Sequence, residues 1–165
     1  MEVIEPVPHV LIAGGGHVGM SVSIVCDTLG WQHSVFDIRE EYSNPEKYSS
    51  ATEVMTSSVS DFLQGETTSS IGRFSDILIM GHDWSVDQEL LIGLLNICKG
   101  GTRIGVIGSK TKWDGFTRAA LESGLTDDEI SIARCPIGLE IGADSPEEIA
   151  LAICAEILAL ERGSI

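Results

Sequence analysis

Short apolar runs alternate with amphipathic stretches along the chain, which is typical of proteins built from parallel strands and crossover helices. The apolar runs predict strands over residues 9–13, 33–38, 52–55, 76–80 and 102–107. Between and after these runs, apolar residues recur at helical spacing. They predict helices over residues 18–29, 85–97, 113–123 and 146–160, with shorter helical turns at 59–63 and from 126.

The predicted helix boundaries rest on capping signals. A Ser or Thr followed three residues later by Glu or Gln forms a capping box, and such pairs begin at Ser85, Thr126 and Ser145. Pro146 suits the first helical position, where its missing N–H costs nothing. Glycines follow the predicted helix ends at residues 30, 100 and 124.

This element order predicts a doubly wound, Rossmann-like α/β fold: a parallel sheet between two helix layers, forming a three-layer sandwich. We expect the strand order 3-2-1-4-5. No repeat or linker divides the sequence, so we expect residues 1–165 to form one cofactor-binding domain.

A glycine motif follows the first predicted strand. Gly14 allows a tight turn, Gly16 leaves room for a pyrophosphate, and Gly19 allows the helix to pack closely on the sheet. Asp37 follows eighteen residues after Gly19, at the carboxyl end of the second predicted strand, where an acid can bind a ribose hydroxyl. Strand, glycines, helix and acid together predict a nucleotide-type binding fold, although many functions use it.

Ligands of such sheets bind beyond the carboxyl ends of the strands, near the point where the strand order reverses. This rule and the glycine motif select the candidate cofactor-binding residues. They are Gly14, Gly15, Gly16, His17, Val18, Gly19, Asp37, Arg39, His82, Asp83, Gly108, Ser109 and Lys110.

Some candidates have two interpretations. His17 and His82 either face each other across the crevice or are ordinary loop residues, and no third residue is spaced to complete a metal site. Lys110 either binds phosphate or is a solvated residue at a helix start. Arg39 leaves the choice between NAD and NADP open, because arginine can accept a 2′-phosphate. Cys135 is a buried structural thiol or a reactive one.

Charge and composition exclude several classes of partner. The chain has 25 acidic and 10 basic residues, a formal net charge of −15, which opposes binding to nucleic acids or anionic membranes. The four cysteines show no disulfide or zinc spacing. No leader sequence is recognisable, so we expect a cytoplasmic protein.

Five segments resemble the C-terminal Rossmann domain of the XdhC/CoxI family, accessory proteins of xanthine and carbon monoxide dehydrogenases. They are AGGGHVG (13–19), FDIREEYSNPEKY (36–48), GHD (81–83), GVIGSKTK (105–112) and CPIGLEIGADSPEEIALAICAEI (135–157). The resemblance implies binding of molybdenum cofactor (molybdopterin) and its delivery to a molybdenum dehydrogenase apo-subunit. It also implies a cysteine desulfurase as a partner. Family members usually carry an N-terminal domain as well, so we expect either a separate chain that supplies it or a reduced, nucleotide-binding role.

Three hypotheses therefore stand. The first is a non-catalytic binding and maturation factor. The second is an NAD(P)-dependent oxidoreductase, which the absence of a recognisable substrate domain disfavours. The third is a nucleotide-sensing regulatory module, which would form a homodimer through an exposed apolar helix.

Overall fold

The sheet orders its strands around the first one. In the computed structural model, which describes residues 7–165, six strands lie in the order β3-β2-β1-β4-β5-β6, and every neighbouring pair is parallel. The order reverses between β1 and β4, as predicted. The strands are β1 (His9–Ala13), β2 (Gln32–Asp37), β3 (Val54–Thr56), β4 (Asp76–Ile79), β5 (Arg103–Val106) and β6 (Ala133–Arg134).

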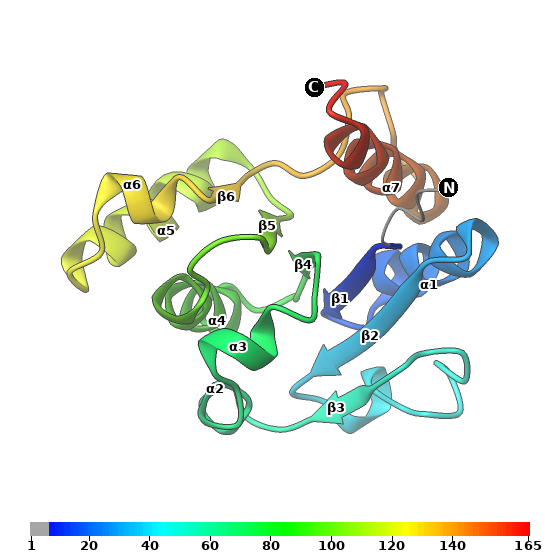
Figure 1. The fold of residues 1–165 in the computed structure, drawn as a ribbon, viewed down its shortest axis with the longest axis horizontal. Helices are drawn as coiled ribbons and strands as arrows, with labels where there is room; N and C mark the ends of the chain where they lie inside the picture. Colours follow the sequence, from blue (N-terminus) through cyan, green and yellow to red (C-terminus); the bar gives the residue numbers. More distant parts are fainter. Residues whose placement is uncertain (1–6) are drawn as a thin grey trace, which may run out of the picture.

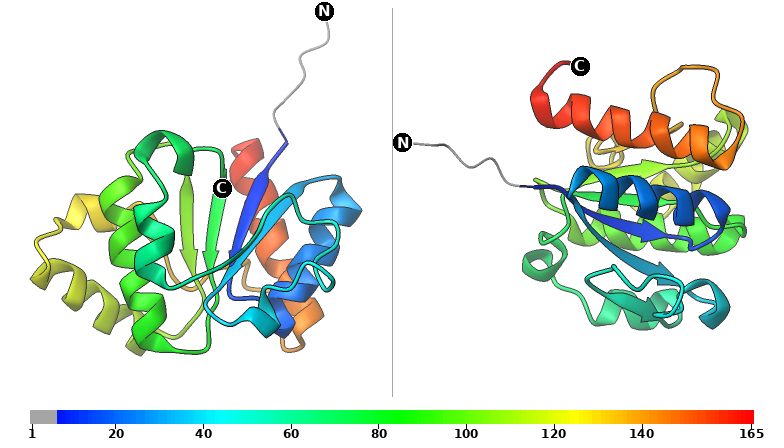
Figure 2. Two further views of the ribbon diagram at one scale, coloured as in Figure 1. Left: turned by 90° about the horizontal axis from the view of Figure 1, so that it is seen from below. Right: turned by 90° about the vertical axis from the view of Figure 1, so that its right-hand side faces the viewer.

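Helices cover both faces of this sheet (Figures 1 and 2). The helical segments are α1 (His17–Leu29), η1 (Glu40–Tyr42), α2 (Val59–Gln64), α3 (Thr68–Ile71), α4 (Trp84–Ile97), α5 (Lys110–Glu122), α6 (Asp127–Ile130) and α7 (Pro146–Arg162). Helices α1 and α7 pack on each other on one face, while α4 contacts both α2 and α5 on the other. The predicted three-layer, Rossmann-like α/β domain is confirmed.

Strand β1 is the centre of two hydrophobic cores. Val10 and Ile12 pack into the core beneath α1 and α7, whereas Leu11 and Ala13 belong to the core beneath α4 and α5. Alternate side chains of a strand point to opposite faces, so a strand buried on both faces needs an unbroken apolar run. This run places the carboxyl end of β1, and the glycine loop after it, between the two helix layers.

Several boundaries differ from the predictions. Strand β6 was missed because it has only two residues, too few to form an apolar run. Helix α3 was missed in a Ser- and Thr-rich stretch, where Thr67 and Ser70 form its capping box. The capping boxes at Thr126 and Ser145 are confirmed.

The predicted start of α4 was wrong. Asp83, not Ser85, is its N-cap, and the Asp83 carboxylate accepts the Ser85 amide. The start of α5 was also placed three residues too late, because Ser109 caps a helix that begins at Lys110. No helix within residues 7–165 is long and apolar enough to cross a membrane.

Candidate functional site

The glycine loop links β1 to α1, and two of its glycines are required by the packing. Gly14 has a φ of +127°, and a Cβ there would overlap with the backbone of Met80 and Gly81. A Cβ on Gly19 would overlap with the Gly14 carbonyl oxygen. These contacts are those expected for the turn glycine and the helix-packing glycine of the motif.

Gly16 is different, because a Cβ there would meet nothing within 4 Å. Gly16 is also the N-cap of α1, with φ −73° and ψ −160°, and no side chain caps this end of the helix. The first backbone amides of a helix lack intrahelical acceptors and carry partial positive charge, which suits them to binding an anion. The open space at Gly16 therefore adjoins a helix start that can hold a phosphate.

The carboxylate of Asp37, at the end of β2, lies against this loop. Its Oδ2 accepts the Gly15 amide at 2.9 Å and Arg39 Nη2 at 3.0 Å. Its Oδ1 accepts the Arg39 amide at 2.9 Å and Arg39 Nε at 3.0 Å. Burial acts to raise the pKa of Asp37, but the hydrogen bonds from Arg39 and Gly15 outweigh it and hold this pKa below its usual value.

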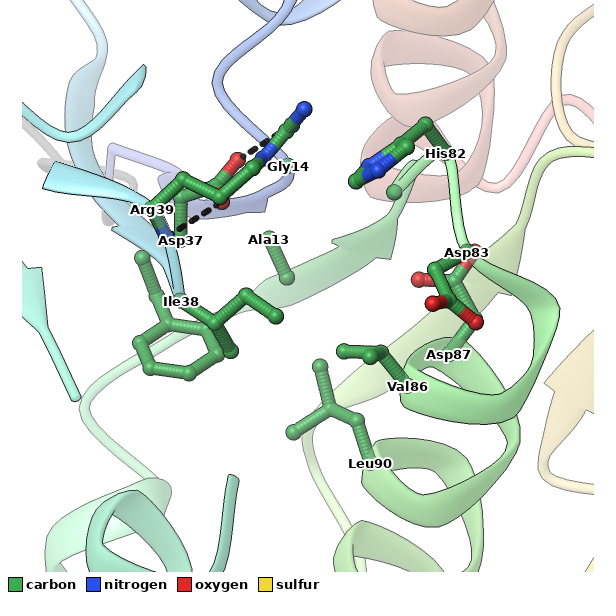
Figure 3. A pocket seen from close by; sticks show the side chains of 12 residues that line it. Ala13, Gly14, Asp37, Ile38, Arg39, His82, Asp83, Val86, Asp87 and Leu90 are labelled. Carbon is green, nitrogen blue, oxygen red and sulfur yellow. Dashed lines mark hydrogen bonds and ion pairs between the residues drawn. The ribbon is translucent and has the colours of Figure 1, made fainter. Parts of the chain in front are cut away.

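A small cleft, open to solvent, lies between the end of β2 and the start of α4 (Figure 3). Ile38 and the Asp37–Arg39 pair form one wall, and Val86 and Leu90 of α4 form the other. The remaining lining residues are Ala13, Gly14, Phe36, Gly81, His82, Asp83 and Asp87. Ligand sites commonly combine apolar side chains with a few polar groups in this way.

Two acidic residues of the α4 wall are in different environments. Asp83 is exposed, and hydrogen bonds from the side chain and amide of Ser85 lower its pKa. Asp87 is only 2% exposed and pairs with Lys112 Nζ at 3.0 Å. Burial raises the pKa of Asp87, and Lys112 opposes that rise.

Lys112 is the buried cation of this region and was not among the predicted site residues. It is 3% exposed, and its Nζ also donates to the Ile107 carbonyl at 2.9 Å. Its helical spacing to Phe116 and Ala120, both buried, was the signal that could have identified it. Asp87 likewise lies on the apolar face of α4.

The structure brings only some of the predicted residues together. Gly14, Asp37, Arg39, His82 and Asp83 line the cleft. The candidates outside its lining are Gly15, Gly16, His17, Val18, Gly19, Gly108, Ser109 and Lys110. The first five of these form the glycine loop and the first turn of α1, and the last three lie at the start of α5.

Cys135 lies after β6, half-buried, with its thiol donating to the Gly108 carbonyl at 3.6 Å. Burial raises the pKa of this thiol, which favours the unreactive protonated form. The other three cysteines are free and buried. Within residues 7–165, no three His, Cys, Asp or Glu side chains are grouped so as to hold a metal ion.

Comparison with known proteins identifies the family. The model of the XdhC Rossmann domain matches residues 10–157. The chain belongs to the XdhC family. A Bacillus halodurans protein whose crystal structure is described as a xanthine dehydrogenase is 30% identical to this XdhC domain, with a TM-score of 0.79. That match covers 96% of this chain and 45% of the other.

Two further proteins are similar to this XdhC domain, one in sequence and one in fold alone. The uncharacterised protein YqeB of Escherichia coli K12 is 27% identical over 95% of this chain, which corresponds to 28% of YqeB. The NAD(P)-binding domain of an exopolyphosphatase-related protein from Archaeoglobus fulgidus is 17% identical, with a TM-score of 0.53. That match covers 67% of this chain and 81% of the other, and at this identity it shows the fold alone. The XdhC domain spans less than half the length of the Bacillus halodurans protein and of YqeB.

Proposed function

We propose that the protein binds molybdenum cofactor in the crevice formed by the glycine loop and the cleft. In this proposal it acts as an accessory factor for a molybdenum dehydrogenase of the xanthine or carbon monoxide type. The observation that carries the proposal is the pairing of an open, uncapped helix start at Gly16 with an apolar cleft, in a chain of the XdhC family.

The cofactor has two parts that fit these two features. Its phosphate would accept hydrogen bonds from the first amides of α1, where the helix dipole also favours negative charge. Its pterin ring would lie in the cleft, between Ile38 and the side chains of Val86 and Leu90. When bound, the cofactor supplies the molybdenum-dithiolene chemistry, and the residues of this chain bind and orient it.

We propose binding in place of catalysis because two of the carboxylates at the cleft are held in ion pairs with basic side chains of the protein. Asp37 is held by Arg39, and Asp87 is held by Lys112. A general acid or base has to exchange a proton with the substrate, whereas both of these carboxylates already bind a basic side chain of the protein. The apo-dehydrogenase is the proposed recipient. A cysteine desulfurase, a separate XdhC N-terminal-type chain or a second copy of this chain would complete the assembly.

Titration with purified molybdopterin, NAD⁺ and NADP⁺ tests the binding step. We expect wild-type protein to bind molybdopterin in the micromolar range, and Gly16→Val to weaken this binding at least tenfold because its side chain fills the open space. Gly115→Val is the matched control, since a Cβ at Gly115 on α5 also meets nothing within 4 Å. Binding of nicotinamide nucleotides alone would contradict the proposal.

A reconstitution assay tests delivery. The protein loaded with molybdopterin is mixed with apo-dehydrogenase, and dehydrogenase activity is followed over time. We expect activity to appear faster with wild-type protein than with free cofactor, and Gly16→Val to abolish the difference. Equal rates with and without the protein would contradict a maturation role while leaving cofactor binding in place.

A further inference from the structure

The Asp37 carboxylate has no acceptor position left for a ligand. A carboxylate has about four lone-pair sites, two on each oxygen. In this structure each oxygen of Asp37 accepts two hydrogen bonds. Oδ2 accepts the Gly15 amide and Arg39 Nη2, and Oδ1 accepts the Arg39 amide and Arg39 Nε. In a dinucleotide site of this fold, the same carboxylate has to accept the ribose hydroxyls.

Arg39 is held in this position from a second side. Its guanidinium carbon lies 3.8 Å from the centre of the Tyr42 ring, a cation–π contact. The Arg39 carbonyl also accepts a hydrogen bond from Ser43 Oγ at 3.1 Å. A bidentate pair with an aromatic contact on its face is more rigid than an ordinary surface ion pair.

The segment that carries Arg39 also covers the glycine loop. A Cβ on Gly15 would overlap with the Tyr42 carbonyl oxygen, so the backbone after β2 packs directly on the loop. The Gly15 carbonyl accepts the Tyr48 hydroxyl at 2.7 Å. Both polar backbone groups of Gly15 are therefore satisfied by side chains of the protein, from Asp37 and Tyr48.

We propose that Arg39 is a specificity-determining residue that keeps ribose diols out of this site, so that the site accepts a phosphorylated heterocycle lacking a diol at Asp37. Adenine dinucleotides carry such a diol and are rejected. Molybdopterin has no ribose, so it needs no hydrogen bond to Asp37. This inference rests on the proposed function in placing the ligand at the glycine loop.

Removing the guanidinium tests this role as a gain of binding. Arg39→Met keeps the length of the side chain and the Arg39 backbone amide, and it frees one acceptor site on each oxygen of Asp37. We expect the affinity for ADP and NAD⁺ to rise at least tenfold, and the gain for 2′-deoxy-ADP to be smaller than for ADP. Adding Asp37→Ala should abolish the gain.

Two controls keep the result interpretable. Arg73→Met removes a guanidinium that pairs with Glu53 and Glu66 away from the cleft, and it should leave ADP affinity unchanged. Arg39→Lys cannot make both side-chain hydrogen bonds, so it should give a smaller gain than Arg39→Met. Thermal melting of each variant establishes that the domain is folded.

The outcomes separate this inference from the proposed function. Tight NAD⁺ binding by wild-type protein, or no gain in Arg39→Met, would overturn the inference even if molybdopterin binds. Tighter binding of NADP⁺ than of NAD⁺ to the wild type would also overturn it, because Arg39 would then bind the 2′-phosphate. A gain in Arg39→Met, without molybdopterin binding to the wild type, would uphold the inference and refute the proposed cofactor.

Discussion

Replacing Gly16 with serine should make the domain more stable while weakening its binding of the ligand. Gly16 is the N-cap of α1 and has the extended backbone conformation that serine adopts at this position. Because a Cβ meets nothing within 4 Å, the new side chain causes no clash in the free protein. Its hydroxyl oxygen can accept the amide of Val18 or Gly19, as cap residues do.

The two effects can be estimated separately. A serine cap is worth a few tenths of a kcal/mol over glycine and about 1 kcal/mol over alanine. For a domain of this size, 1 kcal/mol corresponds to roughly 2–4 °C in Tm, so Gly16→Ser should melt above Gly16→Ala by about that amount. A bound phosphate would lose one charge-assisted hydrogen bond, about 1.5–3 kcal/mol, so its affinity should fall roughly tenfold to a hundredfold.

Differential scanning calorimetry and molybdopterin titration of wild type, Gly16→Ser and Gly16→Ala measure both quantities. Gly14→Ala is the contrasting variant, because the φ of +127° and the overlap of the new Cβ with the backbone of Met80 and Gly81 should destabilise the fold. If Gly16→Ser bound molybdopterin as tightly as wild type, the phosphate would not lie at the start of α1. If Gly16→Ser melted below Gly16→Ala, the helix start would not be uncapped as described.

Two further predictions concern the ion pairs of the site. Lys112→Met should lower the free energy of unfolding, measured by urea titration, by about 3–5 kcal/mol, because it leaves Asp87 buried and unpaired. Adding Asp87→Leu should recover most of that loss. A double variant as unstable as Lys112→Met would refute this explanation. The pKa of Asp37 is lower in the folded protein than its unfolded value near 3.8, so Asp37 contributes stability above that pH and the contribution is lost as the pH falls through the folded pKa. Free energies of unfolding measured from pH 6 to pH 2 should therefore depend less on pH in Asp37→Asn than in wild type. The same loss of stability at low pH in both proteins would contradict this role of Asp37.

The approach of the glycine loop to Asp37 could be predicted because parallel strands bring their carboxyl ends to one edge of a sheet. The motif at Gly14, Gly16 and Gly19 fixes the turn and the helix start, and an acid at the end of the neighbouring strand must lie close by. These are local rules of backbone geometry, so the sequence alone carries them.

The interactions that distinguish this site from an ordinary dinucleotide site could not be predicted in the same way. Arg39 was recognised as a residue near the ligand. Its bidentate hydrogen bonding to Asp37, however, depends on how the segment from Arg39 to Tyr48 packs on Gly15. The Asp87–Lys112 pair joins two helices and depends on their packing. Lys112 was missed because the predicted helix began at residue 113, so its position on the buried face of α5 was not recognised.

A crystal structure of the wild-type protein with bound molybdopterin tests the central claim most directly. The proposal predicts the phosphate at the first amides of α1 beside Gly16, and the pterin in the cleft between Ile38 and Leu90, with the Asp37–Arg39 pair intact. Cofactor bound elsewhere on the surface, or a pterin that enters only after Arg39 has left Asp37, would contradict it.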